Sequence, residues 1–349
     1  MSVNNSANKI LEEIYEIKKR LGKKLLILTH HYQTDQIVSL GSFAGDSFDL
    51  SQKAASDKEA EFIIFCGVHF MAESAAILSA SNQTVQIPEI SAGCPMADMA
   101  DIQSVKKAFS QLEAIVGTKT TTPIVYMNSS ALIKAFCGKN KGLVCTSSNA
   151  DKAFDYALKR REKIFFFPDE HLGKNAADKL GIAPELVILW DSNKKLGGYK
   201  AEDIKKAKVI VWNGYCPIHI DFTTSQILKA RRDFPEAKII VHPECQREVV
   251  KISDASGSTA YIIEYVKNAA KNSIIFIGTE INLIKRLARR HPDKKIIPLY
   301  ASGCKDMFKI NLKNLLKTLK KPGAYNLITI PDEIKKDAKK ALDRMLTLT

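Results

Sequence analysis

Short apolar runs alternate with longer, helix-length segments along most of the chain. Nine runs rich in Val, Ile, Phe and Leu lie at residues 24–29, 61–67, 122–127, 162–168, 184–190, 207–214, 237–242, 272–278 and 294–300. Continuous apolar runs of this length are typical of strands that are buried on both faces. Because helix-length segments separate them, the pattern predicts an α/β protein with parallel sheets rather than a β-sandwich.

Amphipathic helices are predicted near the two ends of the sequence. The first has apolar residues at helical spacing and ends at Gly22; the last begins at Pro331 and has an apolar face made of Ile334, Ala338, Ala341, Leu342 and Met345. No apolar stretch reaches the length of a signal-peptide core at the start of the sequence or of a membrane-spanning helix later on. We therefore expect a cytoplasmic protein with no membrane partner.

One pattern of polar residues and cysteines repeats three times. A predicted strand leads into a polar cluster, at residues 30–32, 126–128 and 242–244, and a cysteine in a small or polar loop closes each unit, at Cys94, Cys216 and Cys304. From cluster to cysteine, the first and third units span 62 and 60 residues, whereas the middle unit spans 88. This repetition predicts three similar domains, each of which brings the carboxyl ends of its strands to one place.

We expect these domains at residues 1–105, 106–224 and 225–312, followed by a C-terminal segment at 313–349 that packs on the body. The middle domain is enlarged near residues 183–208, where one extra strand and its connection would fit. A single large doubly wound sheet with an appendage is the alternative at this point.

The seven cysteines are an odd number, which fits disulfide pairing poorly in a reducing compartment. The chain has no CxxC pair, no GxGxxG loop and no Walker A loop. Three thiolates from three units would suit an iron–sulfur cubane that keeps one iron open for substrate. For these three, a small buried apolar role is an equal alternative, and that role is expected for the others: Cys66, Cys137, Cys145 and Cys245.

Small polar residues recur where a strand or loop meets the next helix: Asp46 with Ser47, Ser147 with Ser148, and Ser258 with Thr259. Backbone amides at such places receive phosphate or carboxylate, although each residue singly is more typical of an N-cap. His219 and Glu244 are candidates for proton transfer near a metal. The alternative for His219 is a buried histidine on a strand at residues 216–220.

The formal net charge of +14 comes mainly from dispersed lysines. A basic nucleic-acid-binding protein is one interpretation of this charge, but no aromatic-interleaved basic run accompanies it. We favour a solvated lysine-rich surface and expect no nucleic-acid partner.

Twelve segments together resemble quinolinate synthase, the A protein of bacterial de novo NAD biosynthesis. They run from about residue 25 to about residue 315 in the family's order: LTHHYQ, AGDSFDL, FCGVHFMAE, SAGCPMADM, VYMNSS, CTSSNA, FFPDEHLG, WNGYCPIHI, VHPEC, SGST, FIGTE and SGCKDM. The resemblance implies three αβα three-layer domains in a pseudo-threefold arrangement around a central [4Fe–4S] cluster, held by Cys94, Cys216 and Cys304. It also implies condensation of iminoaspartate with dihydroxyacetone phosphate to quinolinate, with loss of phosphate and two waters.

Matching the motifs also implies roles for individual residues. Tyr32, His219 and Glu244 would be the acid–base residues. The substrate contacts would be His30, Ser47, Tyr126, Met127 through its backbone, Asn128, Ser147, His242, Pro243, Glu244, Ser258 and Thr259. The expected partners are the two small-molecule substrates, with a transient contact to an iminoaspartate-producing enzyme.

The sequence departs from the family's pattern in three places. Residues 183–208 are additional, the stretch 136–144 is longer by about four residues, and a smaller extension lies between Cys94 and Tyr126. Such extensions are most easily accepted in surface loops. A different hydro-lyase with a three-cysteine cluster is the enzymatic alternative.

Overall fold

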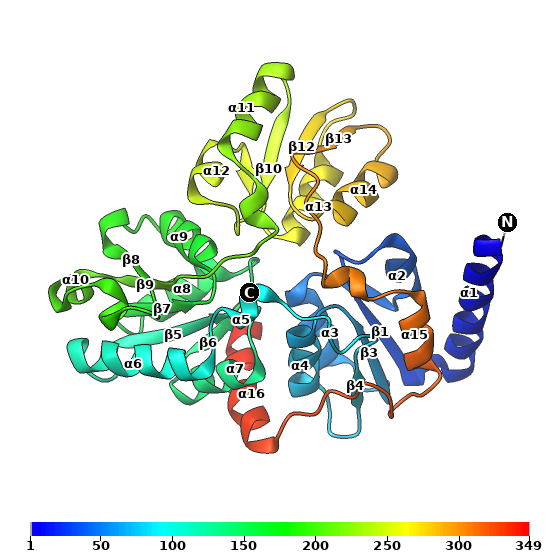
Figure 1. The fold of residues 1–349 in the computed structure, drawn as a ribbon, viewed down its shortest axis with the longest axis horizontal. Helices are drawn as coiled ribbons and strands as arrows, with labels where there is room; N and C mark the ends of the chain where they lie inside the picture. Colours follow the sequence, from blue (N-terminus) through cyan, green and yellow to red (C-terminus); the bar gives the residue numbers. More distant parts are fainter. Residues whose placement is uncertain (1, 349) are drawn as a thin grey trace. The chain divides into compact units, whose positions relative to one another are not determined.

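The structure is a computed structural model that describes residues 2–348, with side chains described from residue 7 onward. Across these residues the named strands form three separate sheets of four, five and four strands, with helices between consecutive strands (Figure 1). Every pairing between these named strands is parallel. The predicted α/β class with three similar αβα domains is therefore confirmed.

The first sheet has the strand order β2–β1–β3–β4. Its strands are β1 (Leu25–His30), β2 (Phe43–Gly45), β3 (Phe62–Cys66) and β4 (Thr84–Gln86), and its helices are α2 (Asp35–Leu40), α3 (Ser47–Ser56) and α4 (His69–Leu78). All six residues of β1 are buried, as its continuous apolar run predicts. Helix α1 (Ser2–Leu21) contacts α15 (Leu312–Leu319), and Gly22 ends α1 with a φ of 52°.

The middle sheet has the order β6–β5–β7–β9–β8. Its strands are β5 (Thr121–Tyr126), β6 (Leu143–Cys145), β7 (Lys163–Phe167), β8 (Val187–Trp190) and β9 (Val209–Trp212). The short helix α5 (Pro95–Asp98) precedes it in the chain, and the sheet's other helices are α6 (Ile102–Val116), α7 (Ala131–Lys139), α8 (Ala150–Leu158), α9 (Glu170–Lys179) and α10 (Ala201–Lys206). β5 and β7 are fully buried, and Phe165 of β7 contacts Phe109, Trp190 and Trp212 in the core.

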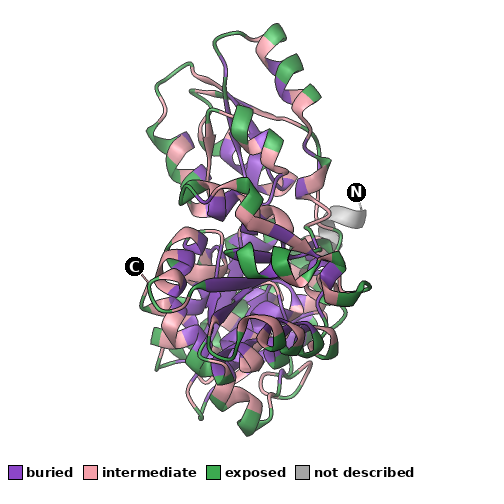
Figure 2. Ribbon diagram, turned by 90° about the vertical axis from the view of Figure 1, so that its left-hand side faces the viewer, coloured by how far each residue is buried: buried purple, intermediate pink, exposed green. Residues whose placement is uncertain are grey.

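The third sheet has the order β11–β10–β12–β13. Its strands are β10 (Lys238–Val241), β11 (Ala255–Ser256), β12 (Ile274–Gly278) and β13 (Lys295–Pro298). Its helices are α11 (Thr224–Asp233), α12 (Arg247–Ile252), α13 (Thr259–Asn268) and α14 (Ile281–Arg290). Its strands β10 and β12 are largely buried, whereas β11 and β13 are mostly half-buried. The helices of the chain alternate between buried and exposed positions (Figure 2).

All three sheets share one strand order if β8 is set aside: second, first, third, fourth. β8 enters the chain between the third and fourth strands of the middle sheet and pairs with β9 at the sheet's edge. The extra strand predicted within residues 183–208 is therefore confirmed. An edge is the one place where a strand can be added without breaking the pairing of the strands already there.

The described chain divides into two compact units. The first holds the residues up to Cys94 together with Cys304–Asp332, and the second holds Pro95–Gly303 together with the segment from Glu333. The first sheet belongs to the first unit, and the other two sheets belong to the second. The three domain boundaries drawn from the sequence stay predictions.

The C-terminal helix α16 (Asp332–Leu346) starts directly after Pro331, one residue later than predicted. Ala338, Ala341, Leu342 and Met345 of its predicted apolar face are buried. The Arg344 guanidinium donates to the carbonyl of Gly142, so the helix packs on the middle-sheet domain. Among the described helices, none is both long enough and apolar enough to cross a membrane.

Candidate active site

The polar clusters occupy equivalent places in the three sheets. The first strands β1, β5 and β10 lead directly into residues 30–32, 126–128 and 242–244. The second strands β2, β6 and β11 lead into the hydroxyl groups at 46–47, 146–148 and 258–259. Ligands of open parallel sheets bind at the carboxyl ends of the strands. Each sheet therefore presents its predicted substrate residues at its ligand-binding edge.

His30 and His242 share one local geometry. The backbone N–H of Tyr32 donates to Nδ1 of His30 (3.1 Å), and the backbone N–H of Glu244 donates to Nδ1 of His242 (3.3 Å). A neutral imidazole whose Nδ1 accepts a hydrogen bond carries its proton on Nε2. Both buried rings can thus offer an Nε2–H donor. Burial and the neighbouring His219 lower the pKa of His242 to about 3, which keeps that ring neutral.

Glu244 is the centre of a buried hydrogen-bond network in the second unit. The Tyr126 hydroxyl donates to Oε1, and Nδ1 of His219 lies 2.6 Å from Oε2. Nε2 of His219 lies 3.1 Å from the hydroxyl of Thr279. The side chains of Glu244 and His219 are 4% and 2% exposed, so the network is shielded from water. The histidine thus connects the carboxylate to a hydroxyl on the third sheet.

The charge state of Glu244 is set by its neighbours. Burial alone would raise the pKa of its carboxyl, but His219, His242 and the Tyr126 hydroxyl together lower it below its usual range. The rings of His219 and His242 stack with centroids 4.3 Å apart. Asp169 interacts electrostatically with Glu244, and burial and that charge raise the pKa of Asp169 well above its usual value. The environment thus drives the pKa values of two carboxyls apart, as in acid–base sites.

Cys216 lies beside this network. Its Sγ, a ring nitrogen of His219 and a carboxylate oxygen of Glu244 are all within 4.8 Å of one another. A thiolate, an imidazole and a carboxylate at this spacing could hold a metal ion. The same closeness brings the two proton-transfer candidates next to one of the three cysteines that close the repeats.

The cysteines divide into two groups by burial. Cys66, Cys137, Cys145 and Cys245 are buried, and burial raises the pKa of Cys66 to about 12. Cys94, Cys216 and Cys304 are only partly buried, and they follow the fourth strands β4, β9 and β13 by eight, four and six residues. Metal ligation requires the thiolate, which deep apolar burial disfavours. The three partly exposed cysteines can therefore offer thiolate ligands to a metal more readily than the four buried ones.

The loops of Cys94 and Cys304 are joined within the first unit. The backbone N–H of Gly93 donates to Oδ1 of Asp306 (3.2 Å), and the Lys309 ammonium donates to the carbonyl of Ser91 (2.6 Å). The Lys309 ammonium also forms an ion pair with Oδ1 of Asp306 (2.8 Å). These contacts hold the two cysteine-bearing loops against each other although more than 200 residues separate them in the sequence.

A family model described as Quinolinate synthetase A protein matches residues 12–347. The chain belongs to the quinolinate synthase family. Quinolinate synthase from Geobacillus sp. (strain WCH70) is 48% identical over 337 residues, which cover 95% of this chain and 91% of that protein. Quinolinate synthase from Corynebacterium glutamicum is 43% identical over 348 residues, or 98% of this chain and 88% of that protein. The named relatives are enzymes, and this member of the family is an enzyme too.

The residues matched to the quinolinate synthase motifs fall into two groups in the structure. In the second unit, Tyr126, Cys216, His219, His242 and Glu244 come together around the buried carboxylate. In the first unit, the rings of His30 and Tyr32 meet edge to face with centroids 4.7 Å apart, and Ser47 begins α3. The family's Cys94 and Cys304 lie in the joined loops of that unit.

The hydroxyl groups of this quinolinate synthase family member differ in their local roles. Asp46 caps α3 by accepting from the backbone of Phe48 and Asp49, and Ser258 caps α13 by accepting from Tyr261. The N-cap interpretation therefore holds for these two residues. Ser147 lies two residues before Asn149, the N-cap of α8, so Ser147 itself is not a helix cap. Three other residues were predicted as substrate contacts. Thr259 is buried and Asn128 is partly buried. The backbone N–H of Met127 donates to the carbonyl of Cys145 (2.8 Å).

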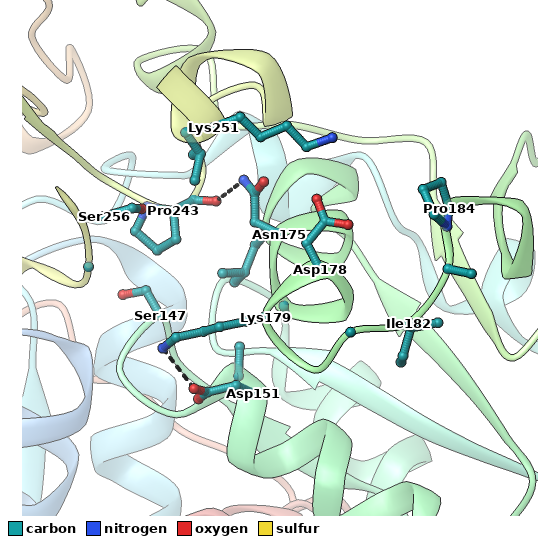
Figure 3. A pocket seen from close by; sticks show the side chains of 17 residues that line it. Ser147, Asp151, Asn175, Asp178, Lys179, Ile182, Pro184, Pro243, Lys251 and Ser256 are labelled. Atoms are coloured by element: carbon teal, nitrogen blue, oxygen red, sulfur yellow. Dashed lines mark hydrogen bonds and ion pairs between the residues drawn. The ribbon is translucent and has the colours of Figure 1, made fainter. Parts of the chain in front are cut away.

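Ser147 and Pro243 border one cavity of about 610 Å³ within the second unit (Figure 3). Asn175 of α9, Lys251 of α12 and Ser256 of β11 also line it. This volume is typical of sites for small molecules. Two predicted substrate contacts from different sheets therefore open onto the same space.

The strand that the alternative for His219 required is absent from the described residues. Residues 216–220 do not form a strand; a turn leads from Cys216 into a single 3-10 turn at His219–Asp221. Pro217 has no backbone N–H for strand pairing, and the carbonyl of Cys216 accepts from the backbone of His219 and Ile220 instead. His219 is buried, but its ring faces the acid–base network rather than an apolar core.

Two residues of the network were missed by the sequence reasoning. Asp169 and Thr279 follow the third strands β7 and β12, a place in the repeat that has no cysteine and no polar cluster of the repeating pattern. The signal was available, because FFPDEHLG and FIGTE are both motifs of the quinolinate synthase family.

Proposed function

We propose that this protein condenses iminoaspartate with dihydroxyacetone phosphate to form quinolinate, with loss of phosphate and two waters. The observation that carries the proposal is the buried Tyr126–Glu244–His219 network beside Cys216. Condensation and dehydration both move protons, and this network offers an ionised carboxylate, an imidazole and a phenol within hydrogen-bond reach of one another. Membership of the quinolinate synthase family supports the same reaction.

We also propose a [4Fe–4S] cluster held by Cys94, Cys216 and Cys304. When bound, such a cluster with three protein ligands supplies one open iron that acts as a Lewis acid toward a substrate oxygen. The equivalent places of the three cysteines after the fourth strands support this ligand set, as does their partial exposure.

The acid–base residues would be Tyr32, His219 and Glu244. Glu244 is ionised and can accept a proton from carbon or from a neighbouring hydroxyl. His219 bridges Glu244 and Thr279, so it can pass a proton between them while its ring orientation stays fixed. Because the network is buried, these transfers would occur away from bulk water, where charge interactions are stronger.

The substrates carry carboxylates and a phosphate, which require hydrogen-bond donors. His30 and His242 can each donate from Nε2, and further hydroxyl and amide donors would come from Ser47, Asn128, Ser147, Ser258 and Thr259. Tyr126, Met127 through its backbone, Pro243 and Glu244 would be the other substrate contacts. Helix N-termini after the second strands favour the same anionic groups. Holding both substrates in one orientation lowers the entropic barrier to forming the carbon–carbon bond.

The setting that we propose is the cytoplasm, with a transient contact to an enzyme that supplies iminoaspartate. Iminoaspartate is an imine and hydrolyses in water, so a short path between the two sites would protect it. No further protein partner is needed for the proposed chemistry.

The test is quinolinate formation by protein purified without oxygen. Wild-type protein supplied with iminoaspartate and dihydroxyacetone phosphate should form quinolinate. Glu244→Gln should keep the cluster absorbance while lowering kcat by at least about 100-fold, a typical contribution of a general base. An intact cluster with no quinolinate from the wild type would contradict the reaction and favour a different hydro-lyase. Unchanged kcat in Glu244→Gln would remove that residue from the acid–base set.

A further inference from the structure

One side chain of the middle-sheet domain, that of Asn175, holds the backbone on both sides of Glu244. Asn175 of α9 donates its two amide N–H groups to the carbonyl oxygens of Pro243 (2.8 Å) and Cys245 (2.9 Å). These two carbonyls belong to the residues immediately before and after Glu244. Figure 3 shows the Asn175 amide pointing toward the carbonyl of Pro243. One planar amide therefore sets the spacing between the carbonyls of the two residues next to Glu244.

Helix α9 is a rigid support for this amide. Its N-cap Asp169 is fully buried and accepts from the backbone N–H groups of His171 (2.8 Å) and Leu172 (2.9 Å). Asn175 itself is only 8% exposed. A buried side chain on a capped helix loses few additional degrees of freedom when it holds a loop, so the position it imposes is well defined.

The contact also joins two sheets. Asn175 follows β7 of the middle sheet, whereas Pro243 and Cys245 follow β10 of the third sheet. Tyr126, which donates to Glu244, comes from the middle sheet as well. The distance between the Tyr126 hydroxyl and the Glu244 carboxylate thus depends on how the middle sheet holds the segment at 243–245.

We propose that Asn175 is a positioning residue for Glu244: its amide holds the backbone carbonyls of the residues before and after Glu244 and thereby sets the carboxylate against Tyr126 and His219. This inference rests on the proposed catalytic role of Glu244. Asn175 makes no proton transfer in this account, and its effect passes through the backbone. Misplacing a reacting group by about 1 Å can cost about 100-fold in rate.

The chain offers a matched control at the same interface. Arg247 at the start of α12 makes a two-pronged ion pair with Asp178 of α9. This pair joins the same two segments of chain but does not touch the residues that flank Glu244. Arg247→Gln removes the ion pair and so measures what a loosened interface alone does to activity.

The experiment compares kcat, KM, thermal midpoint and cluster absorbance of Asn175→Ala and Arg247→Gln. Asn175→Ala should lower kcat by about 10- to 100-fold, with KM changed less than about threefold and the cluster absorbance unchanged. Arg247→Gln should lower the thermal midpoint to a similar extent but change kcat by less than about twofold. Asn175→Ser keeps one hydroxyl donor, so its kcat should lie between wild type and Asn175→Ala; it serves as the test if the Ala variant does not fold.

Two results would overturn the inference. Equal loss of kcat in Asn175→Ala and Arg247→Gln would mean that the amide only stabilises the interface. A raised KM with unchanged kcat would mean that Asn175 contacts substrate in the cavity instead. Glu244→Gln measured in parallel separates the two proposals: if it retains the kcat of the wild type, the catalytic role fails, and if it is inactive while Asn175→Ala behaves like Arg247→Gln, only the positioning role fails.

Discussion

Two buried carboxyl groups at the site, those of Glu244 and Asp169, have opposite hydrogen-bond environments. Both oxygens of Glu244 have partners in the network. Oδ1 of Asp169 caps α9, whereas its Oδ2 is buried with no hydrogen-bond partner in the described part of the chain. An ionised carboxylate needs partners in a buried site, and a protonated one needs fewer. Glu244 thus has the partners that an ionised carboxylate needs, whereas the surroundings of Asp169 favour its protonated form.

The neutral state of Asp169 should make stability depend on pH. Because the folded-state pKa is raised, the unfolded chain loses this proton at lower pH than the folded chain does, and the free energy of unfolding falls as pH rises from about 3.8 toward the folded pKa. An asparagine side chain at this position would keep the cap without this proton. Asp169→Asn should therefore gain stability over wild type as pH rises from about 3.8 toward the folded pKa of Asp169, by up to about 1.4 kcal/mol per pH unit. Thermal unfolding across this range measures it, and a constant difference would contradict it.

The Thr279 hydroxyl forms a hydrogen bond with Nε2 of His219. Thr279→Val preserves the side-chain shape but removes the hydroxyl, so the ring loses this partner. We expect kcat to fall about tenfold, with a loss in the free energy of unfolding of only about 1 kcal/mol. Thr279→Ser keeps the hydroxyl and should retain most of the activity. Equal activity in the Val and Ser variants would show that the hydroxyl has no part in orienting His219.

The sequence predicted Glu244, His219 and Tyr126 as site residues, and the structure brings these three side chains together in one network. The sequence could not identify Asn175. A single Asn inside a helix has no local signature, and its role depends on two carbonyls almost 70 residues away.

At the element scale, apolar runs predicted the long strands and missed the short ones. All nine predicted runs contain strands of the structure. Among the strands of the described residues, β2, β4, β6 and β11 were not predicted, and each has only two or three residues. A run this short carries no periodicity, and it becomes a strand only because a longer neighbour pairs with it.

Helices α7 and α16 cross at a glycine. A Cβ at Gly138 of α7 would overlap the carbonyl of Asp337 in α16. Alanine in a helix is normally favoured over glycine by about 1 kcal/mol, but here the overlap would push the C-terminal helix away from the middle-sheet domain. Gly138→Ala should therefore destabilise the protein by about 2 kcal/mol, seen as a lowered thermal midpoint. Lys139→Ala, an exposed change in the same helix, should have almost no effect, and a stabilised Gly138→Ala would contradict this packing.

At the scale of the whole molecule, the same arrangement of strands and polar residues occurs in all three sheets. In each sheet the first strand delivers an imidazole or phenol, the second delivers hydroxyls at a helix N-terminus, and the loop after the fourth delivers a cysteine. Spacing between the polar clusters and cysteines predicted this arrangement and the enlarged middle member. The shared strand order could not be predicted, because it depends on the short strands. The net charge of +14 has no role in this arrangement.

The most direct test of this account is iron and sulfide content together with the visible spectrum of protein prepared without oxygen. Wild type and Cys137→Ala should each contain about four irons per chain, with matching sulfide and the broad absorbance of a [4Fe–4S] cluster. Cys94→Ala, Cys216→Ala and Cys304→Ala should each lose that iron and absorbance. Iron-free wild-type protein would contradict the account. So would full iron in any of those three variants, or an equal loss of iron in Cys137→Ala.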